Sequence, residues 1–497
     1  INKSQAEQLI NLLLSRKDIA HHDLFWLVDK IFDKRSLEEF ISSDEDGLEN
    51  KSLHTFLYNK IFIESLRLFQ FNGLLWEEAL TKIRRMLCIS LQTSKNKSSS
   101  ALLILAVSIA EQCFLNEYIF SYTDKEELLI NKLKETINSD STSDFEIAIL
   151  ACYQPAYTLL EKCKKLLNYK SKSNEFNNLI DLQIKEPLIE RDIAERIESI
   201  GSIDQKTSLK VKGQYEQFPY PRWRYISDVK NSQLSIEAAI KAETSPNLYI
   251  SITENRPYKV LIAGCGTGQQ VLTAVRYKHA EITAIDLSSN SLSYAKRKSI
   301  EYGLKGIRFI QMDILNIQML SEKYDLIECS GVLHHMEAPE EGLKILTQVL
   351  NKGGYIKLGL YSQLARQDIE KARIIIQQNG YGSTRDEVCR FREDLKRNKY
   401  PEIYSISEWP DFYSTSMCID LCFHIQEHRF TMAKLSELLD SSGVTFLGFV
   451  LPQSIKDQYS KENKDDNNQL DLTRWSNFEE LHPETFRSMY QFWIKKK

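Results

Sequence analysis

A glycine-rich loop between two regular segments most constrains how this chain can fold. The stretch from Val260 to Gly268 reads VLIAGCGTG, with an apolar run of strand length before the loop and a helix-like run after it. Glycine has no Cβ, so the backbone can turn sharply there and come close to a ligand. In open α/β sheets such a loop lies beyond the carboxyl ends of the strands, where ligands bind. The sequence therefore predicts a ligand crevice at this strand–loop–helix junction.

The segments after Tyr258 alternate between apolar runs of strand length and stretches of helical periodicity. This alternation is typical of a parallel sheet with helices on both faces, and right-handed crossovers leave little topological freedom. We therefore predict an α/β fold with a Rossmann-like doubly wound domain that begins near residue 255. Strands are expected at Tyr258–Ala263, Glu281–Ile285, Ile307–Met312, Tyr324–Cys329, Gly354–Tyr361 and Val444–Val450. Helices are expected at Gln269–Tyr277, Ser288–Tyr302, Pro339–Leu350, Met432–Ser441 and Pro483–Ile494, and a surface loop at Ser454–Asn468.

The first 190 residues carry apolar residues at helical spacing, as in Leu9, Leu12 and Leu13, and contain little glycine. This pattern predicts a large all-helical region ahead of the α/β domain. A packed bundle and a docking or dimerisation surface both fit it. The polar segment Ser171–Ile203 is expected to connect the two parts.

An aromatic loop precedes the predicted α/β domain. Residues Tyr215–Trp223 read YEQFPYPRW, and the two prolines within the run cannot continue a helix. They predict a stiff loop that either covers a planar ligand or packs as a linker between domains.

Charge and hydropathy disfavour several classes of protein. The formal net charge is −4 and no polybasic tail stands out, so a nucleic acid is not an expected partner. The longest apolar stretch, Ala101–Ala110, is too short to cross a bilayer. No signal peptide opens the sequence. These features predict a cytoplasmic protein that does not insert into a membrane.

The nine cysteines are scattered without a Cys-x-x-Cys pair, and their odd number favours a reducing compartment. Cys418, Cys422, His424 and His428 lie close in the sequence, but their spacing matches no standard zinc site. Buried cysteines in an amphipathic segment are the better interpretation, and we predict no metal.

The spacing of the glycines indicates the ligand class. A dinucleotide site would read G-x-G-x-x-G, whereas Gly266 and Gly268 are two residues apart here. The loop resembles motif I of the class I S-adenosylmethionine-dependent methyltransferases. Asp286 follows about 20 residues later at a strand end, where a ribose diol is commonly held. The resemblance implies S-adenosylmethionine as the cofactor.

Two further strand ends complete the expected cofactor site. Asp313 resembles the family's acid that accepts a hydrogen bond from the adenine amino group, and Ser330 begins the stretch that lines the methionine part. Ile262 departs from the family, which often has an acid there near the cofactor ammonium, so another group or the backbone must satisfy that charge. The predicted cofactor-binding residues are Gly264, Cys265, Gly266, Thr267, Gly268, Asp286, Leu287, Asp313, Ile314, Ser330, Gly331 and Tyr215.

The residues on the acceptor side follow a less specific pattern. No Asn/Asp-Pro-Pro-Tyr motif follows the fourth strand, which disfavours adenine and glutamine acceptors. Histidines stand there instead, and an imidazole is the natural general base near neutral pH, although packing explains them equally well. The segments Glu408–Tyr413 and His424–Phe430 either form an aromatic slot for an amine or seal the domain. The candidate catalytic residues are His334, His335, Trp409, Tyr413, Glu427 and His428.

A wider set of motifs narrows the resemblance. The glycine loop, Gln217–Trp223, His424–Phe430 and Met489–Trp493 together resemble the rickettsial protein-lysine methyltransferases that modify an outer-membrane surface protein, OmpB. The resemblance covers nearly the whole chain. It implies Nε-methylation of several lysines on a large protein by a homodimeric enzyme. A lysine amine is mostly protonated at neutral pH, so the site has to remove a proton through desolvation or a nearby acceptor.

These interpretations divide the chain into four segments. They are a helical N-terminal region for docking or dimerisation (1–200), a cofactor-binding core (201–361), an insertion between core strands (362–430), and the end of the core with a C-terminal helical segment (431–497). Two rival functions stay open at this point. One is a small-molecule or tRNA methyltransferase on the same fold, and the other is an interaction protein that binds the cofactor without turnover.

Overall fold

The computed structural model describes residues 2–43, 48, 50, 52–92, 99–137, 142–227, 232–244 and 257–497. By its internal contacts the chain divides into two units. The first comprises Ile1–Glu190, Arg222–Ser227 and Ala372–Phe423, and the second Arg191–Pro221, Asp228–Lys371 and His424–Lys497. The roles that the sequence suggested for four segments stay predictions.

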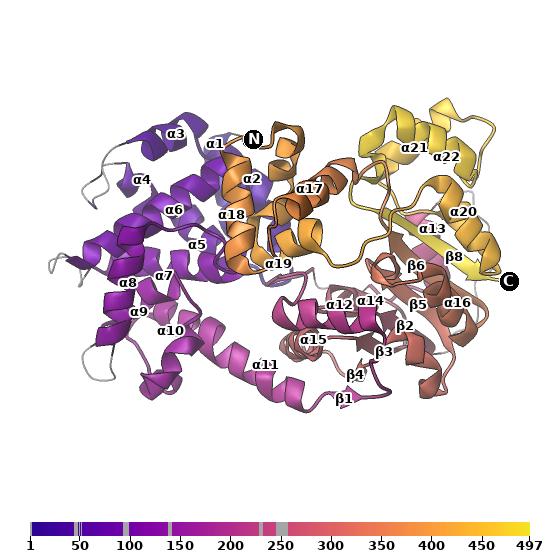
Figure 1. The fold of residues 1–497 in the computed structure, drawn as a ribbon, viewed down its shortest axis with the longest axis horizontal. Helices are drawn as coiled ribbons and strands as arrows, with labels where there is room; N and C mark the ends of the chain where they lie inside the picture. Colours follow the sequence, from indigo (N-terminus) through magenta and orange to yellow (C-terminus); the bar gives the residue numbers. More distant parts are fainter. Residues whose placement is uncertain are drawn as a thin grey trace. The chain divides into compact units, whose positions relative to one another are not determined.

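The first unit is helical in all of its described regular elements (Figure 1). Its centre is the helix α7 (Ser100–Leu115), which is buried along most of its length. Thr123 and Ser143 begin two neighbouring helices with capping boxes, in which a glutamate three residues later bonds back to the cap. Its other α-helices are α1 (Lys3–Leu14), α2 (Phe25–Ile31), α3 (Lys34–Ser42), α4 (Leu53–Leu57), α5 (Lys60–Leu68), α6 (Leu74–Ile89), α8 (Asp124–Thr136), α9 (Asp144–Ala151), α10 (Asn174–Ile180), α18 (Arg385–Lys396) and α19 (Thr415–Cys418).

A buried ion pair ties the segment after residue 372 to the N-terminal helices of this unit. Arg392 on α18 pairs with Glu77 on α6, and both side chains are almost fully excluded from solvent. Lys396 adds a second contact to Glu77 at 2.9 Å. Burial alone would raise the pKa of Glu77, but the charges of Arg392 and Lys396 outweigh it and lower that pKa. The glutamate is therefore ionised at neutral pH and needs its cationic partners.

The second unit is built on a sheet of eight strands in the order β1-β4-β3-β2-β5-β6-β8-β7. Neighbouring strands from β1 to β6 pair in parallel, and β8 runs antiparallel to both β6 and β7. The strands are β1 (Glu198–Ser199), β2 (Tyr258–Ala263), β3 (Ala280–Asp286), β4 (Ile307–Gln311), β5 (Tyr324–Ser330), β6 (Leu350–Leu360), β7 (Val444–Phe449) and β8 (Tyr490–Lys496). The helices are α12 (Lys206–Gln217), α13 (Ile236–Glu243), α14 (Gln269–Ala274), α15 (Ser289–Glu301), α16 (Pro339–Val349), α20 (Met432–Ser441), α21 (Gln453–Glu462) and α22 (Leu472–Leu481). Two more helices, α11 (Glu186–Glu195) and α17 (Gln367–Gln378), run from one unit into the other.

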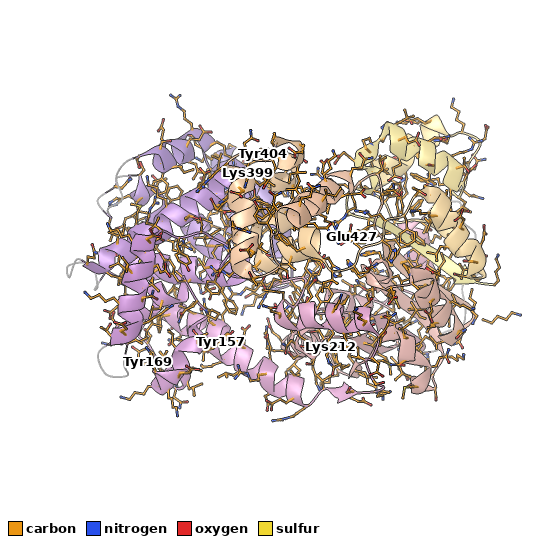
Figure 2. All side chains as sticks on the ribbon, viewed as in Figure 1. Tyr157, Tyr169, Lys212, Lys399, Tyr404 and Glu427 are labelled. Atoms are coloured by element: carbon orange, nitrogen blue, oxygen red, sulfur yellow. The ribbon has the colours of Figure 1, made fainter. Side chains whose placement is uncertain are left out.

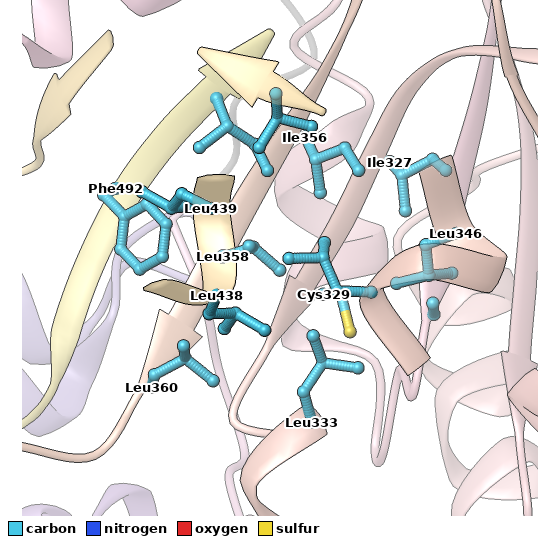
Figure 3. Packing of buried hydrophobic residues seen from close by; sticks show 14 of the residues in the cluster. Ile327, Cys329, Leu333, Leu346, Ile356, Leu358, Leu360, Leu438, Leu439 and Phe492 are labelled. Atoms are coloured by element: carbon cyan, nitrogen blue, oxygen red, sulfur yellow. The ribbon is translucent and has the colours of Figure 1, made fainter. Parts of the chain in front are cut away.

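One continuous apolar cluster covers a face of the sheet (Figure 3). Every second residue of the central strands belongs to this cluster, as Ile327 and Cys329 do on β5 and Ile356 and Leu358 on β6. Helices α16 and α20 cover this face, for example through Leu346. Residues whose side chains lie on the opposite face of the sheet, such as Val260 and Ile262 on β2, are also fully buried. Both faces of the sheet are therefore covered, which confirms the predicted doubly wound α/β class.

Two C-terminal predictions were wrong. Pro483–Ile494 was expected to be a helix, but the chain forms a short 3₁₀ turn at Pro483–Phe486 and then strand β8. Strand β8 lies between β6 and β7. Its Tyr490 and Phe492 belong to the apolar cluster, whereas the indole N–H of Trp493 donates to Glu243. Both faces of the strand carry apolar residues, so the sequence shows a short apolar run in which the strand period of two is not visible.

The charged stretch expected to be a surface loop, Ser454–Asn468, contains the helix α21. Tyr459 is its anchor, because it is fully buried and stacks on Trp475 at 3.7 Å between ring centroids. The polar segment expected as a connection, Ser171–Ile203, is also largely helical, since it contains α10 and α11.

The buried pair predicts a large stability effect. Glu77→Gln leaves the charge of Arg392 without its anionic partner in a buried position, and we expect a loss of about 3–5 kcal/mol in the free energy of unfolding. Urea unfolding followed by circular dichroism measures it. Asp18→Asn, which removes an exposed partner of Arg16, is the control and should leave the midpoint unchanged. Equal midpoints for the Glu77 variant and the wild type would contradict the assignment.

Candidate active site

The glycine loop lies at the carboxyl end of β2 and is held by the backbone of β3. The N–H groups of Gly264 and Cys265 both donate to the carbonyl of Ile285, at 2.9 and 3.0 Å. Gly264 has a φ of +74°, and a Cβ there would stand 2.5 Å from Val332 Cγ2. Gly268 has a φ of +91°, and a Cβ there would meet Ala295 at 2.6 Å. Only glycine fits these two positions, since both the backbone conformation and the neighbours exclude a side chain.

Asp286 ends β3 beside this loop. Its carboxylate accepts the N–H of Gly266 at 2.8 Å and that of Ser288 at 2.9 Å. Burial raises the pKa of Asp286 to about 6, and the charge of Glu216 adds to the effect, although the two backbone hydrogen bonds oppose it. The carboxylate is therefore mostly ionised at pH 7 and is poised to accept a hydroxyl donor.

The next strand end presents Asp313. This residue is buried, and its carboxylate accepts the N–H of Leu315 at 3.0 Å. Ile314 is buried in the apolar cluster. Leu287, between the two acidic strand ends, is half-buried, and its carbonyl accepts the side-chain amide of Gln311 at 2.9 Å. The acids after β3 and β4 thus stand at neighbouring strand ends, as predicted.

The end of β5 lies next to that of β2 in the sheet and adds further groups to the candidate site. Gly331 has a φ of +78°, and its N–H donates to the carbonyl of Gly359 on β6 at 3.1 Å. The carbonyl of Ser330 accepts the side-chain amide of Gln270 at 3.0 Å. Gln270 could not be singled out from the sequence, because a glutamine in the first turn of a helix carries no specific signal.

Residues 215–221, which we call the strap, form hydrogen bonds to the glycine loop and to the residues that follow Asp286. The carbonyl of Tyr220 accepts the N–H of Thr267 at 3.2 Å, and the carbonyl of Pro221 accepts the Thr267 hydroxyl at 2.6 Å. Glu216 accepts the N–H groups of Ser289 and Asn290 at the start of α15, at 2.9 and 3.1 Å. The strap therefore fixes the glycine loop and the loop that follows Asp286 relative to each other.

Tyr215 begins the strap and reaches the acceptor side of the unit. Its carbonyl accepts the hydroxyl of Ser288 at 3.1 Å, while its own hydroxyl lies 3.1 Å from His424 Nε2. The sequence points to Tyr215 of this strap but not to its neighbour Glu216, since nothing in the aromatic, proline-containing run marks a single glutamate as a functional residue.

The two histidines after β5 have different environments. His334 is completely buried and stacks on Tyr361 at 3.8 Å between centroids. Neither of its ring nitrogens has a hydrogen-bond partner among the described residues. Burial, together with the adjacent His335, holds the pKa of His334 well below its usual range. This ring is neutral at pH 7 and supports the packing.

His335 is held by the segment 424–428. Its Nδ1 lies 2.7 Å from the carbonyl of Gln426, and its ring stacks on His424 at 3.6 Å. A carbonyl only accepts, so Nδ1 carries the proton and the lone pair is on Nε2. The N–H of Gln426 donates to His424 Nδ1 at 3.1 Å, so the proton of a neutral His424 is on Nε2, which donates to Tyr215. The backbone of Gln426 thus sets the tautomers of both rings.

Glu427 and His428 belong to the same segment. Glu427, labelled in Figure 2, is fully buried and forms an ion pair with Arg366 at 2.5 Å. Arg429 is a second cation near it, at 3.9 Å. The N–H of His428 donates to the carbonyl of His334 at 2.7 Å, and its Nε2 lies 3.2 Å from the carbonyl of Glu337. The ion pair with Arg366 stabilises the charged carboxylate of Glu427, and this disfavours Glu427 as a base.

Trp409 and Tyr413, the other two catalytic candidates, belong to the first unit. Tyr413 is buried, and its hydroxyl donates to the carbonyl of Ser407 at 2.5 Å. Cys418 and Cys422 are both buried in the same unit, in and after α19. Within the second unit, the structure brings together Tyr215, the two histidines after β5 and the segment 424–428.

The fold and this crevice define a Rossmann-like cofactor-binding domain. Residues 254–373 match the family model described as a methyltransferase domain. This match includes the glycine loop, both acidic strand ends and the histidines after β5. S-adenosylmethionine is the cofactor of this domain, and the residues present fit it. The loop is held at the carboxyl end of β2 by its own backbone, and beside it stands the buried Asp286, whose carboxylate is mostly ionised at pH 7.

Comparisons with whole proteins each cover between a fifth and about half of the chain. An uncharacterized protein of Synechococcus sp. is 32% identical over 217 residues, which is 41% of this chain and 52% of that protein. The ubiquinone biosynthesis O-methyltransferase of Yersinia pestis is 28% identical over 99 residues, 20% of this chain and 40% of that enzyme. The chain thus spans about half or less of the length of these curated relatives. The solved structure of PKMT2 from Rickettsia typhi in complex with AdoHcy aligns with a TM-score of 0.40 and 17% identity, over 52% of each chain.

Among the described helices, the apolar runs all fall short of the length that a membrane crossing requires.

A methyl group at the centre of the loop should impair cofactor binding. Gly266 has a φ of +51°, and a Cβ there would stand 2.7 Å from the carbonyl oxygen of Tyr220 in the strap. We expect Gly266→Ala to weaken binding of S-adenosylhomocysteine at least about tenfold, because loop and strap must separate. Isothermal titration calorimetry measures this change.

Gly303→Ala is the matched control for that variant. Gly303 also has a positive φ, +67°, but a Cβ there meets nothing within 4 Å. It carries the backbone strain without the contact, so its affinity for S-adenosylhomocysteine should equal that of the wild type. Equal losses in both variants would show that strain alone, and not the strap, governs the loop.

Proposed function

We propose that this protein is an enzyme that transfers the methyl group of S-adenosylmethionine to a nucleophilic acceptor. The observation that carries the proposal is the glycine loop of a methyltransferase domain packed against a buried Asp286. The cofactor, when bound, supplies a methyl group that is already activated on a sulfonium. The protein then has to position the acceptor in line and remove its proton.

In this proposal each of three strand ends contacts a different part of the cofactor. Asp286 accepts from the ribose hydroxyls, and Leu287 packs beside them. Asp313 accepts from the adenine amino group, with Ile314 against the ring. Ser330 and Gly331 line the methionine part. The loop residues Gly264, Cys265, Gly266, Thr267 and Gly268 approach the cofactor through their backbone, and Tyr215 covers it.

The thiol of Cys265 takes no part as a nucleophile. The side chain is buried, and burial together with the charge of Asp286 raises the pKa of Cys265 well above its usual value. It therefore stays protonated in the loop.

We propose His335 as the group that takes the acceptor's proton. Its Nδ1–H is fixed on the Gln426 carbonyl, which leaves the basic lone pair on Nε2. His334 supports it from a fully buried position. His428 anchors the segment behind it through its backbone. Glu427, paired with Arg366, positions the same segment.

The acceptor that we propose is the side-chain amine of lysines in a bacterial outer-membrane protein. The motif combination that resembles protein-lysine methyltransferases supports it, and a large helical unit offers the contact area that a protein substrate needs. Trp409 in that unit, which is half-buried, is a candidate substrate contact, whereas the buried Tyr413 supports the packing of the unit. We extend the proposal to a cytoplasmic homodimer that uses its helical region for docking or dimerisation and acts before its substrate is exported.

A small-molecule acceptor is the second candidate. Its support is the partial match to a ubiquinone biosynthesis O-methyltransferase, which covers 20% of this chain. Such an enzyme needs a compact acceptor pocket and no protein docking surface.

A methyl-transfer assay separates these acceptors. We expect radiolabel from S-adenosylmethionine to appear in purified outer-membrane protein, with mass spectrometry showing methylated lysines. Asp286→Ala, which removes the proposed ribose contact, is the inactive control. Label that appears only in the small-molecule or tRNA fraction of a bacterial extract would reject the lysine acceptor and keep the methyltransferase. Binding without transfer to any fraction would favour a non-catalytic role.

Cofactor affinity should depend on pH through Asp286. Its pKa is raised to about 6 in the ligand-free protein, and the ribose hydroxyls donate to the ionised form. Affinity for S-adenosylhomocysteine should therefore rise as pH increases through 6, by about tenfold between pH 5 and pH 7, and then level off. Titration calorimetry across this range tests it. In Asp286→Asn the step should vanish, and a step of equal size in that variant would assign it to another group.

A further inference from the structure

Gln270 carries a buried acceptor atom without a donor. It lies in the first turn of α14, directly after the glycine loop, and its Nε2 donates to the carbonyl of Ser330 at 3.0 Å. A carbonyl only accepts, so this bond fixes which end of the amide is nitrogen. The other end, Oε1, is buried and has no hydrogen-bond partner among the described residues. Buried acceptors of this kind are rare because they lose their water without replacement.

The position of this oxygen indicates which group of the cofactor could donate a hydrogen bond to it. Strands β2 and β5 are neighbours in the sheet, and Gln270 links the loop after β2 to the last residue of β5. This is the end of the crevice that we assign to the methionine part of the cofactor. The strongest hydrogen-bond donor on that part is its α-ammonium group.

The chain lacks the acid that often accompanies the cofactor ammonium in related methyltransferases. Ile262 stands two residues before Gly264, where related methyltransferases often carry an acid, and its side chain is fully buried. Two acids on the strands next to β2 are already engaged. Asp286 accepts two backbone N–H groups beside the loop, and Glu328 accepts the hydroxyl of Tyr277 at 2.7 Å. The side-chain oxygen of Gln270, by contrast, has no donor among the described residues.

We propose that Gln270 Oε1 accepts a hydrogen bond from the α-ammonium of the cofactor and so orients its methionine part. The inference rests on the proposed function, because it assumes the same cofactor in the same crevice. The bond to Ser330 holds the amide in place before the cofactor arrives. Binding satisfies the buried oxygen and gains a charge-assisted hydrogen bond, so the site selects ligands that carry the amine.

The test compares two ligands in three proteins. The ligands are S-adenosylhomocysteine and its analogue without the α-amine, and the proteins are the wild-type chain, Gln270→Met and a control variant. Methionine keeps the length of the side chain and the helix propensity but removes the amide. Gln269→Met, one residue earlier on the same helix, is the matched control. Calorimetry gives the dissociation constants of all six pairs.

We expect the wild type and Gln269→Met to bind S-adenosylhomocysteine about tenfold or more tightly than the analogue. Gln270→Met should bind the two ligands almost equally. The loss of the bond to Ser330 can displace the loop, but a displaced loop weakens both ligands alike and leaves their ratio unchanged.

The remaining outcomes overturn the proposal in distinguishable ways. A wild type that binds both ligands equally would remove the role of Gln270 and leave the methyltransferase function standing. The same conclusion follows if Gln270→Met keeps the wild-type ratio. A wild type that binds neither ligand would overturn the proposed function and this inference together.

Discussion

The crevice depends on two backbone N–H groups that converge on one carbonyl. Gly264 and Cys265 both donate to Ile285, the residue before Asp286, so the loop after β2 is fixed to the end of β3. This geometry needs a positive φ at Gly264 and leaves no room for a side chain there. The N–H of Gly266 can then reach the carboxylate of Asp286. Asp286, which we propose as the acceptor of the ribose hydroxyls, is therefore positioned by the loop, and the loop is positioned by the strand that carries Asp286.

The strap of residues 215–221 extends this arrangement to a third segment. Glu216 accepts N–H groups at the start of α15, where a negative charge is favoured, and the carbonyls of Tyr220 and Pro221 hold Thr267. The chain continues without interruption into residues 222–227, which belong to the first unit. In that unit Arg222 pairs with Glu117, and Arg224 pairs with Glu111. Each unit thus holds its own part of this segment through polar contacts within that unit.

Sequence reasoning succeeded where the signal is local. Six of the strands were expected close to their observed bounds, because each is a short, mainly apolar run between turn signals. It failed for β8, whose alternating residues fill both faces between two other strands, and for α21, whose single aromatic anchor, Tyr459, does not make a helical stripe. The glycine loop and Asp286 could be found because their spacing is fixed by the turn that contains them. Gln270 and Glu216 could not, since their roles depend on carbonyls and N–H groups that only the folded chain brings near.

The same distinction separates the two halves of the site. The cofactor half consists mainly of backbone atoms within one stretch, and residues 254–373 match a methyltransferase family model as a block. The proposed acceptor half is assembled from residues 334–335 and 424–428, and its second segment lies beyond that match. Gln426 sets the tautomers of His335 and His424 through its own backbone, so the nitrogen that we propose as the proton acceptor depends on how this later segment docks. The same segment also contacts the strap, because the hydroxyl of Tyr215 lies 3.1 Å from His424 Nε2. The matched domain therefore contains the proposed cofactor half but only part of the proposed acceptor half.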